Sequence, residues 1–291
     1  MGLFRLFKNF KHIAANPGCS TARSLIRHSL WHMVKRAAPL PLKVRLTERS
    51  ELSINHRAEM NGCVALAWSQ RLYDYHNMSF LLDVTGHSTF CRTGLDIGAN
   101  IGIYSLLMSE SREVQMHAFE PHPATFQALQ KILDYNHRPN VKAWNFALSD
   151  KDGSVSFSNA DFNPTNRIVS EAGKGQTTTE VMALRGDDWC QRENVQPDII
   201  KIDTEGHEAI VLQGLADALR TTKLVLVEEN VSLDGTLLSP EAGIFDGPWY
   251  VDFPQRKFVT RKHAPEDAVY LNKNAHSELN ALGYSLPKVS C

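Results

Sequence analysis

Cysteine is scarce in this sequence, and long hydrophobic runs are missing from it. The 291 residues include five cysteines, an odd number without close pairs, which argues against a disulfide framework or a zinc site and favours a reducing, cytoplasmic setting. No apolar run approaches the roughly 20 residues of a membrane span. Arg5, Lys8 and Lys11 interrupt the first apolar residues, so we expect no secretory signal. No Gly-Lys-Ser or Gly-Lys-Thr occurs, which excludes a P-loop.

The charge is nearly balanced over the whole chain but is unevenly distributed. The formal net charge is −1, so no overall attraction to nucleic acid is expected. Residues 1–50, however, contain ten Lys and Arg and a single acid, Glu48. This asymmetry indicates a separate unit at the start, and we predict a basic, largely helical extension over residues 1–75.

Residues 1–15 mix Leu, Phe and Ile with Arg and Lys, a pattern typical of a basic amphipathic helix. Three interpretations remain open. The helix contacts a membrane surface or a partner peripherally, it packs on the domain that follows, or it is an organellar transit segment. We therefore expect a cytoplasmic protein with peripheral membrane contact through residues 1–15 as one option.

From residue 91 onward, apolar strands alternate with helical segments. We predict strands over residues 93–97, 114–119, 141–146, 198–202 and 224–227, and helices over 101–109, 124–136 and 208–219. This alternation predicts an α/β domain in which helices cover both faces of a parallel sheet. Segments near 249–253, 257–261 and 268–271 look like closing strands. The fold class that we expect is a mostly parallel sheet of seven strands, one fewer than these eight segments.

One segment interrupts the alternation. Residues 150–187 are rich in Gly, Ser, Thr and Asn, and a long insertion of this kind is often a lid or a substrate loop. We expect the domain to span residues 76–273, with 150–187 as its insertion and 274–291 as a tail.

Residues 94–105 have the pattern of a strand, a glycine turn and a helix. An apolar run ends at Asp96, and Gly98 and Gly102 follow. Glycines let the backbone approach a ligand closely, and the start of a helix presents unpaired N–H groups. Glu120 follows the next predicted strand, 24 positions after Asp96, near the ~20-residue offset of a ribose-binding acid. The stretch therefore predicts a nucleoside-binding turn.

The spacing of the glycines distinguishes two classes of cofactor. A dinucleotide turn needs G-x-G-x-x-G to admit a pyrophosphate, whereas this turn has Gly94, Gly98 and Gly102 with Asn100 between the last two. Asp96 would repel a phosphate but suits the ammonium and sulfonium charges of S-adenosylmethionine. The turn thus favours S-adenosylmethionine, and an NAD(P)-dependent oxidoreductase is the alternative.

A polar cluster follows the predicted strand at residues 198–202. Asp203, Glu205 and His207 come within five positions, and Glu228 follows the next strand. We expect Asp203, Glu205 and His207 to be catalytic, because carboxylate and imidazole groups can act as a general base or bind a catalytic metal. Asp203 and Glu205 are also candidate ligands of a divalent cation. In the alternative, Glu205 only shapes the start of the next helix and His207 is solvated.

Four blocks of sequence, in this order, resemble the FkbM family of S-adenosylmethionine-dependent methyltransferases. They are residues 95–105, 118–123, 145–150 and 200–208, and residues 268–271 are similar to the family's closing strand. The resemblance implies a Rossmann-like class I methyltransferase fold. It also implies O-methylation of a sugar, a glycan or a secondary metabolite. A non-catalytic binding protein on the same fold is the main alternative.

The resemblance also implies which residues bind the cofactor. They are Asp96, Gly98, Asn100, Gly102, Tyr104, Phe119, Glu120, Ala147 and Asp203. The turn would line the methionine, Glu120 would bind the ribose, and Phe119 and Ala147 would flank the adenine together with Pro121 and Leu148. His207 stands where members often have Ala, which leaves its role open. The expected partner is a small-molecule or glycan acceptor rather than nucleic acid, and the oligomeric state is not predicted.

Overall fold

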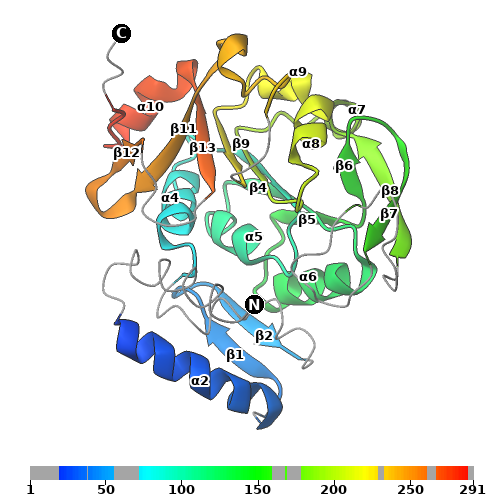
Figure 1. Cartoon of the computed structure of the whole chain (residues 1–291), viewed down its shortest axis with the longest axis vertical. Helices are drawn as coiled ribbons and strands as arrows, with labels where there is room; N and C mark the ends of the chain where they lie inside the picture. The colour runs from blue at the N-terminus through cyan, green and yellow to red at the C-terminus, as the bar shows by residue number, and fades with distance from the viewer. Residues whose placement is uncertain are drawn as a thin grey trace.

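A central sheet of eight strands organises the molecule (Figure 1). The computed structural model describes residues 20–37, 39–55, 72–158, 168, 178–228, 233–260 and 267–287. In these ranges the chain also forms a three-stranded sheet and a two-stranded hairpin. Residues 1–15, on which the prediction of an amphipathic helix rests, lie outside the described residues.

The strand order of the central sheet is β12-β11-β13-β10-β9-β3-β4-β5. The strands are β3 (Thr93–Ile97), β4 (Gln115–Phe119), β5 (Val141–Trp144), β9 (Ile199–Ile202), β10 (Leu224–Val227), β11 (Phe245–Asp252), β12 (Lys257–Val259) and β13 (Ala268–Asn272). The five strands from β10 to β5 are parallel, and β13, β11 and β12 are antiparallel. The predicted Rossmann-like fold is confirmed. The number of strands is eight rather than the expected seven, because the short β12 pairs along the outer side of β11.

Alternate residues of the buried strands face two separate apolar layers. In β9, Ile199 belongs to one layer, whereas Ile200 and Ile202 belong to the other. The first layer includes side chains of α4 (Tyr75–Thr85), α5 (Ile103–Met108) and α6 (Pro123–Tyr135), and the second those of α7 (Gly186–Glu193), α8 (Glu208–Gly214) and α9 (Ala216–Leu219). Because successive strand side chains point to opposite faces, helices cover both sides of the sheet, as the sequence predicts.

The chain after β5 builds the smaller sheet, in the order β6-β8-β7. Its strands are β6 (Ala147–Ser149), β7 (Gly153–Ser158) and β8 (Thr178–Arg185). Most of residues 159–177, the centre of the expected lid or substrate loop, lies outside the described residues. The described part of the insertion is a regular sheet, and its strands β6 and β7 line a pocket at the carboxyl ends of β3, β4 and β9.

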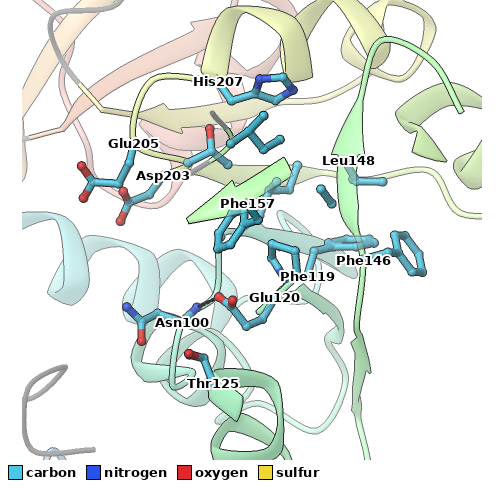
Figure 2. Close-up of a pocket in the computed structure, with 16 residues that line it drawn as sticks. Asn100, Phe119, Glu120, Thr125, Phe146, Leu148, Phe157, Asp203, Glu205 and His207 are labelled. Carbon is cyan, nitrogen blue, oxygen red and sulfur yellow. Dashed lines mark hydrogen bonds between the residues drawn. The ribbon is translucent and has the colours of Figure 1, made fainter. Parts of the chain in front are cut away.

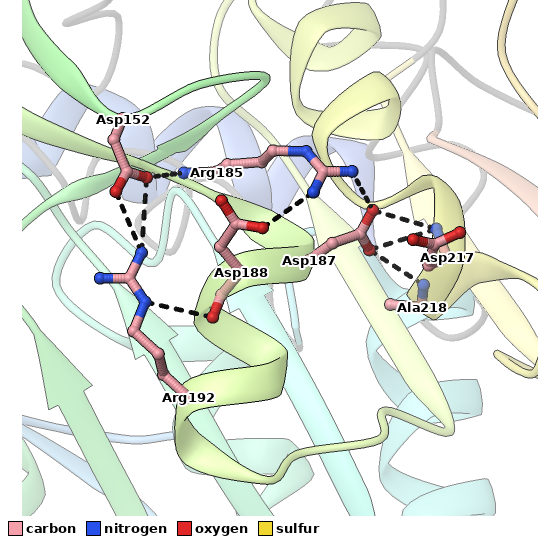
Figure 3. A network of polar contacts seen from close by, with 7 residues as sticks. All are labelled: Asp152, Arg185, Asp187, Asp188, Arg192, Asp217 and Ala218. Atoms are coloured by element: carbon pink, nitrogen blue, oxygen red, sulfur yellow. Dashed lines mark hydrogen bonds and ion pairs between the residues drawn. The ribbon is translucent and has the colours of Figure 1, made fainter.

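A network of ion pairs attaches this small sheet to the helices beside it (Figure 3). At the end of β8, the Arg185 guanidinium lies 2.9 Å from an Asp187 oxygen and 2.8 Å from an Asp188 oxygen. The Asp187 carboxylate in turn accepts hydrogen bonds from the backbone N–H groups of Asp217 and Ala218. Since unpaired N–H groups at a helix start favour a carboxylate, Asp187 links β8 to the start of α9.

The first described residues form helix α2 (Thr21–Ala37) and a hairpin of β1 (Leu42–Arg45) and β2 (Glu51–Ile54). The hairpin was not predicted, because its strands are only four residues long and carry charges. Asn136, at the end of α6, accepts a hydrogen bond from the backbone of Glu51 and donates one back, so the hairpin is tied to the domain. No helix of the described residues is both long and apolar enough to cross a membrane.

The last described residues pack on the domain. Helix α10 (His276–Ala281) places Leu279 in the first apolar layer, and Tyr284 lies there too. After Tyr284, the backbone N–H of Ser285 donates to the carbonyl of Arg256, and the Ser285 carbonyl accepts from the N–H of Phe258. These two hydrogen bonds cover the outer side of β12. At the opposite edge of the sheet, the Lys142 ammonium of β5 lies 2.7 Å from a Glu193 oxygen.

Candidate cofactor site and active site

The carboxyl ends of β3, β4 and β9 meet the small sheet around a pocket (Figure 2). The pocket holds about 650 Å³ of space, part of it open to solvent. It is lined by the glycine turn after β3, the end of β4, the chain from Phe146 to Leu148, Phe157 of β7, Ile168 and the loop after β9. Ligands of open α/β sheets bind at this edge.

The glycine turn brings two strand ends into backbone contact. Gly98 has φ +77°, and a Cβ atom there would lie 1.9 Å from the carbonyl oxygen of Asp203. The N–H groups of Gly98 and Ala99 both donate to the carbonyl of Phe119, at 3.0 and 2.9 Å. Asn100 also has a positive φ, of 51°. Only glycine allows the ends of β3 and β9 to approach so closely.

Glu120 lies at the centre of the pocket with both carboxylate oxygens held by backbone amides. One oxygen accepts the N–H of Asn100 at 2.9 Å and the other that of His122 at 2.8 Å. Burial raises the pKa of Glu120 to about 7, against the opposing effect of these two hydrogen bonds. Each carboxylate oxygen can accept a second hydrogen bond. The side chain is therefore oriented to receive two neighbouring hydroxyl groups.

Aromatic and aliphatic side chains form one end of the pocket. The rings of Phe119 and Phe146 lie 5.6 Å apart at 61°, and Leu148 and Phe157 complete the apolar lining. Aromatic faces of this kind suit a flat, apolar ring.

His207 belongs to this apolar end. Its Nε2 atom lies 3.1 Å from the Ser149 hydroxyl on β6, and burial lowers its pKa. The imidazole is thus neutral near pH 7 and tied to the wall of the pocket. In Figure 2 it lies on the side of Leu148, away from the carboxylates of Asp203 and Glu205.

Asp203 and Glu205 lie together at the other end of the pocket (Figure 2). Their loop turns sharply, with φ +57° at Glu205 and +107° at Gly206. The fully buried Glu208 holds the loop, because its carboxylate accepts the N–H groups of Thr204 at 2.8 Å and Gly206 at 3.0 Å. Glu208 was not predicted to have a role, although an acid in the first turn of a helix is a known signal for one.

A buried lysine lies directly behind the pocket. The Lys201 ammonium is 3.3 Å from an Asp96 oxygen, 3.4 Å from an Asp203 oxygen and 3.3 Å from the carbonyl of Gly98. Only 3% of the Lys201 side chain is exposed. Burial opposes its charge, but the surrounding carboxylates outweigh this and raise its pKa. Lys201 was not predicted to have a role, although a lone lysine in an otherwise isoleucine strand requires buried partners.

Three carboxylates lie side by side beyond this lysine. Val227 of β10 pairs with Ile202 of β9 and with Ala268 of β13. The adjoining positions, Asp203, Glu228 and Asp267, therefore stand at the ends of three neighbouring strands, which are about 4.8 Å apart from one to the next. Burial and the charges of Asp74 and Asp203 raise the pKa of Asp267 well above its ordinary value. We call Asp203, Glu228 and Asp267 the carboxylate row.

Residues 96–238 match the model of the methyltransferase FkbM domain. We refer to residues 96–238, which are similar to this family, as the FkbM domain. The match includes the glycine turn, Glu120, the small sheet and the loop after β9, so the resemblance stated from the sequence is confirmed.

Two curated proteins are similar to part of this chain. The chain is 32% identical over 142 residues to the hexuronic acid methyltransferase AglP of Haloferax volcanii. The aligned region covers 48% of this chain and 56% of that protein. It is 28% identical over 144 residues to Methyltransferase 1 of Beauveria bassiana, covering 42% and 58%. The chain therefore spans little more than half the length of either relative.

Among solved structures, a methyltransferase FkbM from Methylobacillus flagellatus is similar with 16% identity and a TM-score of 0.41. The match covers 62% of this chain and 43% of that one. At such low similarity, the fold of the FkbM domain is established by its own strand order, described above.

The FkbM domain brings most of the predicted cofactor residues to the pocket. Those that line it are Gly98, Asn100, Phe119, Glu120, Ala147 and Asp203. The other three support the turn from behind in the described part of the chain. Asp96 is fully buried and accepts a hydrogen bond from Ser105 at 2.6 Å. Gly102 starts α5 against Leu129, and the Tyr104 hydroxyl donates to Asp74.

A divalent cation at Asp203 and Glu205, one option left open by the sequence, finds no support in the geometry. Across the described residues of the FkbM domain and its flanks, no three His, Cys, Asp or Glu side chains are arranged to hold a metal ion. Asp203 instead contacts the Lys201 ammonium. A neighbouring ammonium satisfies a carboxylate by charge, as a metal ion would.

Proposed function

We propose that the protein is an S-adenosylmethionine-dependent O-methyltransferase that acts on a hydroxyl group of a sugar, a glycan or a secondary metabolite. The observation that carries the proposal is Glu120. Its carboxylate is fixed by two backbone amides next to an apolar aromatic pocket, and it belongs to an FkbM methyltransferase domain.

The residues of the pocket fit this cofactor. Phe119, Phe146 and Leu148 would contact the adenine, and Glu120 would accept hydrogen bonds from both ribose hydroxyls. The absence of a side chain at Gly98 leaves the backbone accessible beside Asp203. When bound, S-adenosylmethionine supplies an electrophilic methyl group. The protein then has to align an acceptor oxygen with that group and remove the acceptor proton.

The carboxylate row supports an acceptor site beyond Asp203. Asp203 lines the cofactor pocket, and Glu228 and Asp267 continue from it along the strand ends. Carboxylates accept hydrogen bonds from sugar hydroxyls, and a buried one with a raised pKa holds a proton more readily near neutral pH. We assign the acceptor proton to Asp267 or Asp203.

Replacing either carboxylate of this pair should slow the reaction. We expect Asp203→Asn or Asp267→Asn to lower kcat by roughly 10²–10⁴-fold. Asp267→Asn should leave the affinity for S-adenosylmethionine little changed, whereas Asp203→Asn should also weaken it, because Asp203 lines the cofactor pocket. The measurement is methyl transfer to a panel of sugars and glycan extracts, detected by the mass of the methylated product. Asp134→Asn, at an exposed position of α6, is the matched control. Full activity in both site variants would refute the assignment of the base.

The raised pKa of Glu120 makes cofactor binding depend on pH. In the free protein this group titrates at about 7, and only its charged form accepts from both ribose hydroxyls. Binding should therefore release a proton below pH 7, so the affinity rises with pH up to about 7 and then levels. Calorimetric titration with S-adenosylmethionine on both sides of pH 7 checks this expectation. Glu120→Gln should bind more weakly and release no proton, and a profile that matches the parent would contradict the role.

A further inference from the structure

Helix α2 exposes apolar side chains on one side. Ile26 is 59% exposed and Leu30 is 49% exposed, whereas Ser24 and Trp31 are buried. Residues four apart lie one above the other on a helix, and residues seven apart also share a side. Ile26 and Leu30 therefore form an outer stripe, and Ser24 and Trp31 mark the opposite, inner side.

Positive charges frame the outer stripe. Arg23 and Arg27 are exposed, and each lies three positions before one of the apolar residues, which places them on the same side of the helix. The hairpin, drawn at the same end of the molecule in Figure 1, adds the exposed Lys43. Residues 1–50 together have a formal charge of +9. The apolar stripe thus has arginines along one edge.

An anionic lipid surface fits this combination best. Single exposed apolar side chains are common, but an apolar pair flanked by arginines is the pattern of a helix that lies in a membrane interface. Nucleic acid would pair with Arg23 and Arg27 and leave Ile26 and Leu30 in water. Each Arg near an anionic lipid surface contributes about 1 kcal/mol, and the buried apolar area adds to it.

We propose that α2 docks the protein peripherally on a membrane that contains anionic lipids, with Ile26 and Leu30 among the headgroups and Arg23 and Arg27 on the lipid phosphates. The helix has 17 residues and is about 25 Å long. It would lie along the surface. This inference concerns a face of its own and does not depend on the methyl transfer proposed above.

The test is co-sedimentation of the full chain with vesicles. One set contains phosphatidylcholine alone and the other adds phosphatidylglycerol. We expect binding to the anionic vesicles, a decrease with salt, and a loss of at least about tenfold in affinity for the double variant Ile26→Asp, Leu30→Asp. The control is Met182→Asp, because Met182 is similarly exposed, at 52%, but lies on β8. It should bind like the parent.

Three results would overturn the proposal. They are equal binding to neutral vesicles, unchanged binding of the double variant, and retention on RNA or on an acidic protein with no retention on vesicles. Circular dichroism and calorimetric titration with S-adenosylmethionine on the same samples show whether the double variant is folded. They also separate a failure of docking from a failure of the proposed methyltransferase activity.

Discussion

Lys201→Met is expected to lower the free energy of unfolding by about 3–5 kcal/mol, which is a large part of the stability of an ordinary domain. The Lys201 ammonium pairs with Asp96, whose side chain is fully buried. Without the lysine, Asp96 would be a buried charge with no cation beside it. The carbonyl of Gly98 would lose a donor as well, so the cofactor turn should loosen and the affinity for S-adenosylmethionine should fall.

Urea denaturation of matched variants measures this effect. The double variant Lys201→Met, Asp96→Asn should recover much of the loss, since it removes both charges together. Lys142→Met is the control, because Lys142 makes a closer ion pair, of 2.7 Å, but is 57% exposed. It should cost less than about 1 kcal/mol. If Lys201→Met costs no more than this control, the buried pair does not stabilise the site as we infer.

Gly98→Ala is expected to reduce the affinity for S-adenosylmethionine by about 100-fold, because small misplacements in a site have effects of this size. The new Cβ atom would lie 1.9 Å from the Asp203 carbonyl oxygen, and backbone cannot move aside as a flexible side chain can. The ends of β3 and β9 would have to separate. That displaces Asn100 on one side of the pocket and Asp203 on the other.

A second glycine provides the control for backbone strain. Gly243 has φ +69°, close to the +77° of Gly98, but a Cβ atom there would meet no other atom within 4 Å. Gly243→Ala therefore carries only the cost of the left-handed conformation, about 1–2 kcal/mol. Thermal melting and calorimetric titration of both variants separate strain from collision. Equal behaviour of the two variants would show that the contact between Gly98 and Asp203 is unimportant.

The centre of the fold was predictable because its strands are buried on both faces. β3 and β10 have the predicted bounds, and β9 begins one residue later than expected, since short, largely apolar segments bounded by polar or turn residues indicate buried strands. Helix ends were less predictable. The helix predicted over residues 208–219 is broken at Leu215 into α8 and α9. Helix α7 was missed altogether, because its start depends on Asp187, whose partners come from a later segment.

The residues of the candidate site also fall into predictable and unpredictable ones. Gly98, Asn100 and Glu120 come from local motifs, which can be recognised in the chain. Lys201 and Asp267 have no such motif. Their properties arise only when β9, β10 and β13 are paired, and sequence spacing does not show which strands are neighbours. His207 was expected to be catalytic, and that role remains a prediction. The hydrogen bond between His207 and Ser149 forms because β6 of the small sheet places Ser149 beside the imidazole.

The two edges of the central sheet affect how copies of this protein meet. An uncovered edge strand offers backbone groups to which a second molecule can add a strand. Here the backbone of Ser285 occupies the outer side of β12, and β5 carries a lysine already bound to Glu193. A second copy adding to β5 would have to remove water from this ion pair. Growth of this sheet from one molecule into the next is therefore disfavoured, which protects a protein with so large an apolar interior from aggregation.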